Sequence, residues 1–563
     1  MECITPLALQ EMRTSMPAFP RAPFRMTAVV AVVAAAGLLA GCAATPSGEP
    51  AAQEITYAIT GANLSAGHMD PHSSQLDISA TVGRYTLDSL VAQDTDGEFV
   101  PWLATAWTIS DDQLTYTFDL RDDVTFSDGE PFNAEAVKAN FDHIIAPETA
   151  SAQAASMLGY STDGGAYVDT TVVDEFTVAV NFSEPYAPFL QAASTSLLGF
   201  YSPKVLAEKA DQLKTGGPGI TVGSGPFILS EYTPDQQLDY TANPDYNWGP
   251  ANAEHTGPTD LTSFTIRILP EASVRTGALT SGEVQVAGNI SPTTVSQIGD
   301  GFTVNSVELP GIPYSLYLNE TYGVFQDEKV RKAFSLGIDL DPAVKSIFFE
   351  QYPRAWSILG PTTPNSYDAS LEGANPFDAD KAAALLDEAG WTGTDSEGYR
   401  TKDGERLSAR WIAWTPVNDD NAALADVIQS DLKKIGFEIK REVLEPAAYN
   451  EQYGPKTFDL TDWGFSGVDA DALRSHLHTG GFQNASQVSD PTIDGLLEDA
   501  VATSDPAERA ALYKQVQQWN AETVAIVPLY VPSLITASSD TVDGLTFDLY
   551  GRPLFYGASI SAN

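Results

Sequence analysis

Hydrophobic and polar residues alternate along several short segments of the chain, and longer segments repeat hydrophobic residues at the spacing of a helix. Residues 114–120 alternate strictly, which is typical of a half-buried strand. Residues 407–415 and 437–444 predict two further strands, and residues 420–435 between them predict a helix that ends at Gly436. A strand, a helix and a strand in this order favour a parallel pair with a right-handed crossover. We therefore expect the C-terminal half to be α/β.

Capping and turn residues predict further elements. Asn133 and Asp378 are typical helix caps, and each predicts a helix that begins directly after it. Residues 223–227 (GSGPF) predict a tight turn that leads into a strand, and residues 94–97 (DTDG) predict a hairpin turn. The first strand is predicted at residues 55–60.

One apolar run, residues 27–39, is too short to cross a bilayer, because a membrane-spanning helix needs about 20 residues. The run follows two arginines and ends in residues 39–42 (LAGC), which makes it an export signal. The pattern resembles a bacterial lipobox, which implies cleavage before Cys42 and a lipid on its sulfur. The alternative is an ordinary cleaved signal with a chance cysteine. Residues 1–41 are thus predicted to be a lipoprotein signal peptide, and residues 42–53 a flexible tether.

Charge and cysteine content exclude several classes of function. The 563-residue chain has 75 acidic and 30 basic residues, a formal net charge of −45. Nucleic acid and anionic lipid head groups are therefore not expected as partners, because phosphate binding needs a basic surface. Cys42 would be the one cysteine left after cleavage, since the other is Cys3. Disulfides within the mature chain, thiol catalysis and thiolate metal sites are excluded on that count. We expect membrane contact through the lipid anchor only.

An ordered set of short motifs runs through the chain. The densest stretch lies between residues 90 and 141, and the motifs continue beyond it. They are PWLA at 101–104, AW at 106–107, LTYTF at 114–118, VTFSDG at 124–129, GSGPF at 223–227, NPDY at 243–246, VRKAF at 330–334 and GID at 337–339. This set resembles the extracytoplasmic solute-binding proteins of family 5, which serve ATP-driven importers of oligopeptides, dipeptides and nickel.

The resemblance implies an α/β fold of the periplasmic-binding-protein type, with two main lobes, a hinge and an inserted third domain (the cluster C arrangement). Lobe I would combine residues 54–83, 222–311 and 523–563. Residues 84–221 would form the inserted domain II, and residues 312–522 would form lobe III. A ligand would lie between lobes I and III, which would close around it by hinge motion.

The resemblance also implies a function. The chain would be the extracellular, lipid-anchored substrate-binding component of an ABC importer, which captures a short peptide and delivers it to a membrane permease. We expect a monomer without a cofactor and without catalytic activity. One alternative is the same role for a non-peptide solute, namely an oligosaccharide, an opine-like compound or a nickel chelate. An alternative of another class is a secreted glycosidase-like enzyme that uses Asp469 and Asp471 as a pair of carboxyl groups.

The resemblance places the ligand at one strand end of lobe III. In family members that take peptides, an aspartate shortly after an aromatic-bearing strand end pairs with the amine of the peptide. The matching strand end here is residues 463–466, and the aspartate position falls on Val468. An unpaired buried ammonium is very costly, so a neighbouring carboxylate would have to replace the missing one. The predicted ligand-binding residues of this segment are Trp463, Gly464, Phe465, Ser466, Asp469 and Asp471; loop and capping roles are the alternative for the two aspartates.

Five other residues are candidates by their chemistry. Trp414, Trp356 and Tyr317 could each present a flat ring to a ligand, and core packing is the alternative for each. Asn319 could donate a hydrogen bond, with a turn as its alternative role, and His72 is the fifth candidate ligand-binding residue. No metal site is predicted, because the histidines lack a His-Glu-x-x-His spacing.

Overall fold

The computed structural model describes residues 53–61, 64–74, 76–151, 153–161 and 165–561, which all belong to one compact unit. The predicted signal peptide and Cys42 lie outside the described residues. None of the helices in the described part of the chain is both long enough and apolar enough to cross a membrane.

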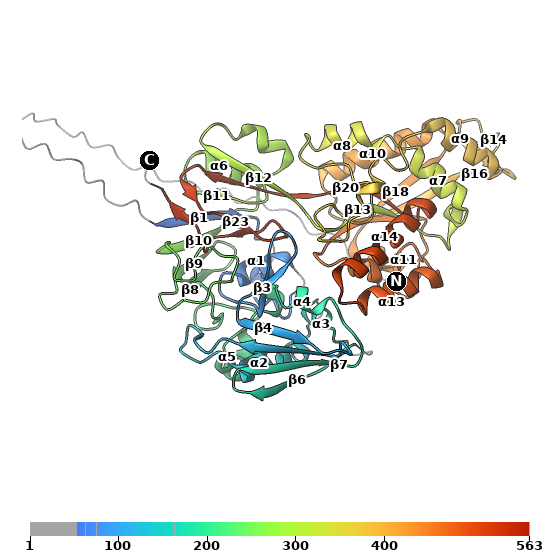
Figure 1. Cartoon of the computed structure of the whole chain (residues 1–563). Coiled ribbons are helices and arrows are strands. Elements are labelled where there is room, and N and C mark those ends of the chain that lie inside the picture. The colour runs from blue at the N-terminus through green and yellow to red at the C-terminus, as the bar shows by residue number, and fades with distance from the viewer. Residues whose placement is uncertain (1–52, 62–63, 75, 152, 162–164, 562–563) are drawn as a thin grey trace, which may run out of the picture. The chain divides into compact units, whose positions relative to one another are not determined.

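A seven-stranded sheet combines strands from both ends of the described chain (Figure 1). The strand order is β12-β21-β11-β1-β10-β9-β8, and β1 is parallel to its neighbours β10 and β11. Helix α6 (Ala272–Thr280) packs on β1, β11 and β21. The strands are β1 (Glu54–Ile59), β8 (Phe227–Thr233), β9 (Gln237–Ala242), β10 (Ser263–Ile268), β11 (Val286–Ala287), β12 (Phe302–Glu308) and β21 (Ser533–Ser539).

A second, antiparallel sheet of four strands has the order β4-β5-β7-β6. Helix α2 packs on β6 and β7, and phenylalanine and tyrosine rings fill the core beneath it. The strands are β4 (Ala104–Ile109), β5 (Thr115–Leu120), β6 (Tyr167–Asp174) and β7 (Thr177–Phe182). The helices from this part of the chain are α1 (Asp77–Gly83), α2 (Ala134–Ile145), α3 (Gln153–Leu158), α4 (Phe189–Ala192) and α5 (Pro203–Lys209).

A third sheet has five strands in the order β18-β17-β19-β13-β20. Its strands are β13 (Gly311–Leu318), β17 (Ser408–Trp414), β18 (Glu438–Leu444), β19 (Leu460–Ser466) and β20 (Ile526–Tyr530). The helices around it are α7 (Glu328–Leu336), α8 (Leu340–Ile347), α9 (Ala379–Glu388), α10 (Asp419–Lys434), α11 (Pro446–Tyr453), α12 (Ala472–Leu477), α13 (Pro491–Val501) and α14 (Pro506–Thr523). After β20 the chain enters the seven-stranded sheet through β21. The lobe boundaries given above stay a prediction.

The remaining strands form small ribbons. They are β2 (Val91–Gln93) with β3 (Phe99–Pro101), β14 (Gly393–Thr394) with β15 (Arg400–Lys402) and β16 (Glu405–Arg406), β22 (Val542–Asp543) with β25 (Ser559–Ile560), and β23 (Thr546–Phe547) with β24 (Pro553–Leu554).

Local sequence signals predict these elements well. The β17-α10-β18 unit is confirmed, because β17 and β18 pair in parallel on either side of α10. Both predicted caps are confirmed: Asn133 Oδ1 accepts the Ala136 N–H at 3.0 Å, and Asp378 Oδ1 accepts the Lys381 N–H at 2.8 Å. The predicted hairpin turn at residues 94–97 joins β2 to β3.

The glycines of the predicted turn at residues 223–227 allow a close approach of two backbones. A Cβ atom on Gly223 would lie 1.9 Å from the carbonyl oxygen of Thr86, and one on Gly225 would lie 2.7 Å from the carbonyl carbon of Thr86. The Gly225 N–H donates to the Thr86 oxygen at 2.9 Å. Only glycine fits at these two positions, which sets the turn against the segment that follows α1.

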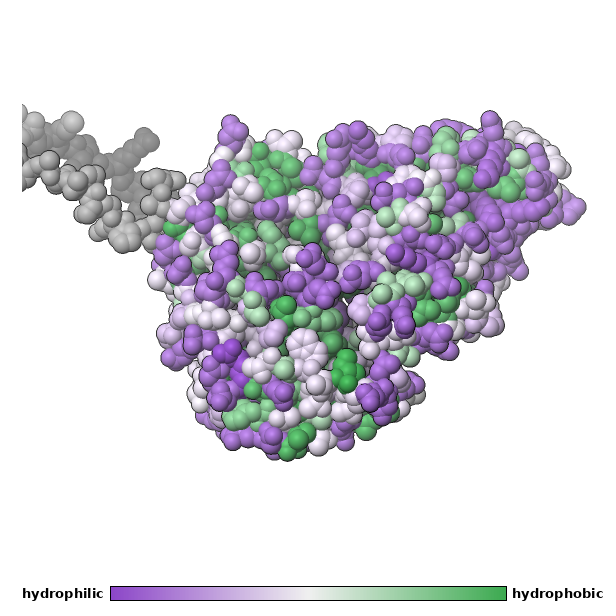
Figure 2. All heavy atoms as spheres, viewed as in Figure 1, coloured by the Kyte–Doolittle hydropathy of each residue, from purple (hydrophilic) through white to green (hydrophobic). Residues whose placement is uncertain are grey.

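Hydrophilic side chains dominate the face of the molecule drawn in Figure 2, and hydrophobic residues form small areas between them. Acidic residues outnumber basic ones by 75 to 30 in the whole chain. An acidic, hydrated surface of this kind favours solubility and makes no demand on the fold.

Candidate functional site

A cavity of about 350 Å³ lies among four segments that are distant in sequence. The segments are residues 84–102, 191–195, 226–255 and 544–557, and Val468 completes the lining. Aromatic rings form much of the wall: Tyr85, Trp102, Phe227, Tyr246, His255, Phe547, Tyr550, Phe555 and Tyr556. Small-molecule sites in proteins have this size and this mixture of apolar wall and few polar groups.

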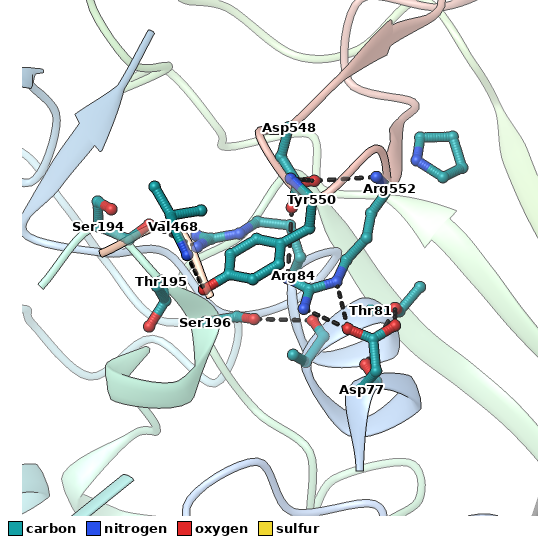
Figure 3. Close-up of polar contacts among 12 residues, drawn as sticks. Asp77, Thr81, Arg84, Ser194, Thr195, Ser196, Val468, Asp548, Tyr550 and Arg552 are labelled. Carbon is teal, nitrogen blue, oxygen red and sulfur yellow. Dashed lines mark hydrogen bonds and ion pairs between the residues drawn. The ribbon is translucent and has the colours of Figure 1, made fainter. Parts of the chain in front are cut away.

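Arg552 lines the cavity, and its positive charge is paired with carboxylates of the protein. The Arg552 Nε–H donates to Asp77 Oδ1 at 2.9 Å, and Nη1 lies 3.4 Å from Asp548 Oδ2 (Figure 3). Asp548 Oδ1 also accepts the backbone N–H groups of Tyr550 and Arg552, each at 2.9 Å. Burial raises the pKa of Asp548, and the nearby guanidinium of Arg552 opposes that rise. Arg552 is therefore neutralised by two carboxylates within the protein.

A second arginine, Arg84, lies at the C-terminal end of α1 and has different partners. Its Nη1 donates to the Ser89 hydroxyl at 2.9 Å and to the Leu87 carbonyl at 3.4 Å, and its Nη2 donates to the Ser194 carbonyl at 2.8 Å. Its guanidinium carbon lies 5.0 Å from the centre of the Trp102 ring. All of these partners are neutral, in contrast to those of Arg552.

Tyr550 contacts Val468, the one lining residue that comes from the segment 312–522. Its hydroxyl oxygen accepts the Val468 N–H at 3.5 Å, and the guanidinium carbon of Arg552 lies 4.2 Å from the centre of its ring (Figure 3). Val468 stands where the resemblance expects an aspartate, and the structure places it in the cavity wall.

Asp88 connects the glycine-rich turn to a neighbouring segment through side-chain hydrogen bonds. Its Oδ2 accepts from the Ser224 hydroxyl at 2.9 Å and from Trp248 Nε1 at 3.0 Å. Complete burial raises the pKa of Asp88 to about 7. The motif at residues 223–227 thus serves to position the wall, through the backbone contact with Thr86 and this side-chain network.

The predicted aspartates of the strand end are each bound to an arginine. Asp469 accepts from both terminal nitrogens of Arg509, at 2.6 and 2.7 Å. Asp471 accepts from Arg474 at 2.7 and 2.9 Å. A glycosidase-like use of these two carboxyl groups would have to break both ion pairs.

The aromatic residues predicted at the same strand end pack against other rings. Trp463 stacks on Tyr317 with ring centres 4.1 Å apart, and its Nε1 donates to His476 Nε2 at 3.3 Å. Phe465 is half-buried with its ring 5.5 Å from that of His476, whereas Gly464 and Ser466 are exposed. The lining of the large cavity includes none of these residues.

The five candidates chosen by chemistry lie in separate places. Asn319 is buried and donates to the carbonyls of Lys456 and Phe458, and Tyr317 is buried beneath Trp463. Trp414 is 47% exposed at the end of β17. The remaining two lie in other contacts: Trp356 is stacked by Arg354, and His72 is buried with its Nε2 2.7 Å from the Gly199 carbonyl. Their roles in ligand binding stay predictions.

Sequence reasoning missed Arg84, Tyr550 and Arg552 as cavity residues. Residues 548–552 (DLYGR) carry a detectable signal of local structure, because an aspartate shortly before a glycine is typical of a turn closed by the aspartate side chain. That signal predicts a turn and says nothing of a cavity. The described residues contain no group of three or more His, Cys, Asp or Glu side chains that could hold a metal ion.

A cavity of this size with an aromatic wall is typical of proteins that bind a small solute. Comparison with known proteins defines the class. The family model for bacterial extracellular solute-binding proteins, family 5 (middle region), matches residues 98–484. The chain belongs to this family, and the predicted periplasmic-binding-protein type of α/β fold is confirmed with it.

Three similar proteins illustrate the relationship. Protein XP55 of Streptomyces lividans is 30% identical over 549 residues, which cover 93% of each chain. The dipeptide-binding protein of Pseudomonas aeruginosa is 28% identical and covers 82% of this chain and 86% of its own. Among solved structures, NikA from Brucella suis in complex with Fe(III)-EDTA has a TM-score of 0.76 at 26% identity, over 90% of this chain and 100% of NikA.

Proposed function

We propose that the chain is the extracytoplasmic substrate-binding component of an ABC importer and that its cargo is a short peptide. Membership of family 5 supports the class of function. The similarity to a dipeptide-binding protein over most of both chains supports a peptide cargo. The protein would bind its cargo without altering it.

The observation that carries this proposal is the chemistry of the cavity wall. A short peptide combines side chains of varied polarity with one positive and one negative end. The wall offers aromatic rings for the side chains and a guanidinium without a carboxylate partner among the described residues, that of Arg84, for the negative end. A volume of about 350 Å³ suits a ligand of a few residues and not a folded partner.

Capture by hinge closure requires that the ligand contacts both sides of the hinge. Val468 lies in the predicted lobe III, and the other lining residues lie in the predicted lobe I and domain II. A ligand in this cavity would touch all three and stabilise their closed arrangement. The closed form would then deliver the peptide to a membrane permease.

The proposal includes a lipid anchor on Cys42, with residues 42–53 as a tether between membrane and protein. Replacement of the cysteine (Cys42→Ala) should then release the protein from the membrane fraction. Continued membrane association of that variant would contradict the anchor and leave the cavity unaffected.

Calorimetric titration of the purified protein with peptides of two to five residues tests the cargo. Saturable binding should raise the free energy of unfolding by about 2.7 kcal/mol at a peptide concentration one hundred times the dissociation constant. Oligosaccharides, opine-like compounds and a nickel chelate form the comparison set. Saturable binding of one of these, with no response to any peptide, would contradict the peptide cargo. Chemical change of any added compound would contradict a pure binding role.

A further inference from the structure

We propose that Arg84 is the anchor for a carboxylate group of the cargo. This inference rests on the proposed function in one respect, since it takes the 350 Å³ cavity as the place where the cargo binds. It goes beyond that function by naming a chemical group that the cargo must carry and the residue that recognises it.

The two cavity arginines differ in how their charges are compensated. Arg552 forms ion pairs with Asp77 and Asp548. Arg84 forms no ion pair with any carboxylate among the residues that the structure describes, and its three hydrogen bonds end on a hydroxyl and two carbonyl oxygens. Of the two arginines that line the cavity, Arg84 is thus the one whose charge is not paired with a carboxylate of the described residues.

The pKa of Arg84 also indicates that no carboxylate of the described residues pairs closely with its guanidinium. Burial lowers the pKa of Arg84 to about 10, against the opposing influence of the Asp548 and Asp88 carboxylates. Neither carboxylate is within ion-pair distance of the guanidinium, and Asp88 already accepts from Ser224 and Trp248. A buried charge without a close partner is costly, and a ligand carboxylate would remove much of that cost.

The guanidinium is held in place before any ligand arrives. Bonds to the Leu87 and Ser194 carbonyls and to the Ser89 hydroxyl fix its plane, and the Trp102 ring lies 5.0 Å from its centre. In Figure 3 the side chain extends behind the Tyr550 ring toward Ser194 and Val468. A planar, preformed fork loses little entropy when it binds, and it matches a carboxylate in shape.

The cargo class that follows is a solute with a free carboxylate. The C-terminus of a short peptide and the carboxylates of an organic chelate share this chemistry. An ester, an amide or a neutral sugar would leave Arg84 buried without an anion and would bind weakly.

The test is a cycle of one ligand change and one residue change, measured by calorimetry. The ligands are a peptide that binds the protein and the same peptide with its C-terminus amidated. Amidation should weaken binding to the unaltered protein about 10–100-fold, the range expected for loss of a charged hydrogen-bonded pair. In Arg84→Gln the free acid and the amide should bind with equal affinity.

Two further variants separate recognition from folding. Arg84→Lys keeps the charge but loses the fork, so it should retain part of the preference for the free acid. Arg121→Gln is the matched control, because Arg121 pairs with Asp123 at an exposed position and should leave the full preference intact. The comparison of acid with amide in the unaltered protein needs no variant to fold.

Every outcome decides the inference. The carboxylate anchor would be wrong if amidation lowered the affinity equally in the unaltered protein and in Arg84→Gln, or lowered it in neither. In both cases the peptide function would remain supported. If no peptide binds, Fe(III)-EDTA is the second probe: binding that Arg84→Gln abolishes would support the anchor while the peptide function fails. Failure of both probes would count against both proposals.

Discussion

Two regions of this protein look alike in sequence but differ in structure. The strand-end region (residues 463–471) and the C-terminal wall (residues 544–557) both combine aromatic rings with aspartates near an arginine. In the strand-end region every aspartate is bound to its own arginine, as in the pair of Asp469 with Arg509. In the C-terminal wall the one aspartate, Asp548, is bound to Arg552, which also pairs with Asp77 of α1. The neighbouring Arg84 has no carboxylate partner among the described residues.

The aromatic rings differ in the same way. Trp463 lies face to face with Tyr317, so one of its faces is already covered. The rings of the C-terminal wall border an open cavity. Residue type alone therefore does not distinguish a binding surface from a packed interior; what distinguishes them is whether the partner of each group lies within the protein.

The largest loss of stability is expected when the ion-pair partner of Asp469 is removed. Arg509→Ala would leave the Asp469 carboxylate largely buried, since its side chain is 14% exposed, and should lower the free energy of unfolding by about 3–5 kcal/mol. Urea unfolding measures the effect. Lys138→Ala is the control, because its pair with Asp142 is exposed and should cost less than about 1 kcal/mol. An equally small loss for Arg509→Ala would mean that the strand-end charges are not structural.

The next test concerns Trp463. Trp463→Ala removes the stack on Tyr317 and the hydrogen bond to His476, and should lower the free energy of unfolding by about 2–3 kcal/mol. If the cavity is the binding site, the dissociation constant for the cargo should not change. Trp414→Ala, at the end of the neighbouring strand and 47% exposed, should cost less stability. Weaker cargo binding by Trp463→Ala would instead support the site predicted from the sequence.

The pH dependence of stability tests the packing around His476, which contacts Trp463 and Phe465 of the strand-end region. Burial lowers the pKa of His476 to about 4, below its ordinary value of 6.5. The unfolded chain therefore takes up a proton in this range before the folded protein does. The stability that neutral His476 contributes is complete above pH 6.5 and is lost as pH falls through 4, an effect of about 3 kcal/mol.

The measurement is the free energy of unfolding against pH for the unaltered protein and for His476→Gln. The difference between the two should shrink as pH falls from 7 to 4, because only the unaltered protein has this group to protonate. Parallel curves would show that His476 is not held neutral by the fold.

Much of the fold could be predicted from the sequence because its signals are local. Asn133 and Asp378 cap helices through residues only three positions away, and β17, α10 and β18 follow one another along the chain. The cavity could not be predicted in this way, since Arg84 is 384 residues from Val468, and Val468 is 82 residues from Tyr550.

The sequence also did not predict which charged side chains form ion pairs with each other. Asp469 and Arg509 are separated by 40 residues, and nothing in either segment indicates that they pair. The sequence did identify the importance of position 468, where a valine replaces the expected aspartate, and this residue lines the cavity. The sequence could not show that Val468 and Arg84 line the same cavity, because only the folded chain brings the two residues together.

The most direct test of the central claim is to fill the cavity. Ala253 lines it, whereas Ala251, two residues earlier in the same loop, is exposed and does not. We predict that Ala253→Trp abolishes calorimetric binding of the cargo while Ala251→Trp binds it with unchanged affinity, both variants remaining folded. Equal affinity for the two variants would show that the cargo binds elsewhere.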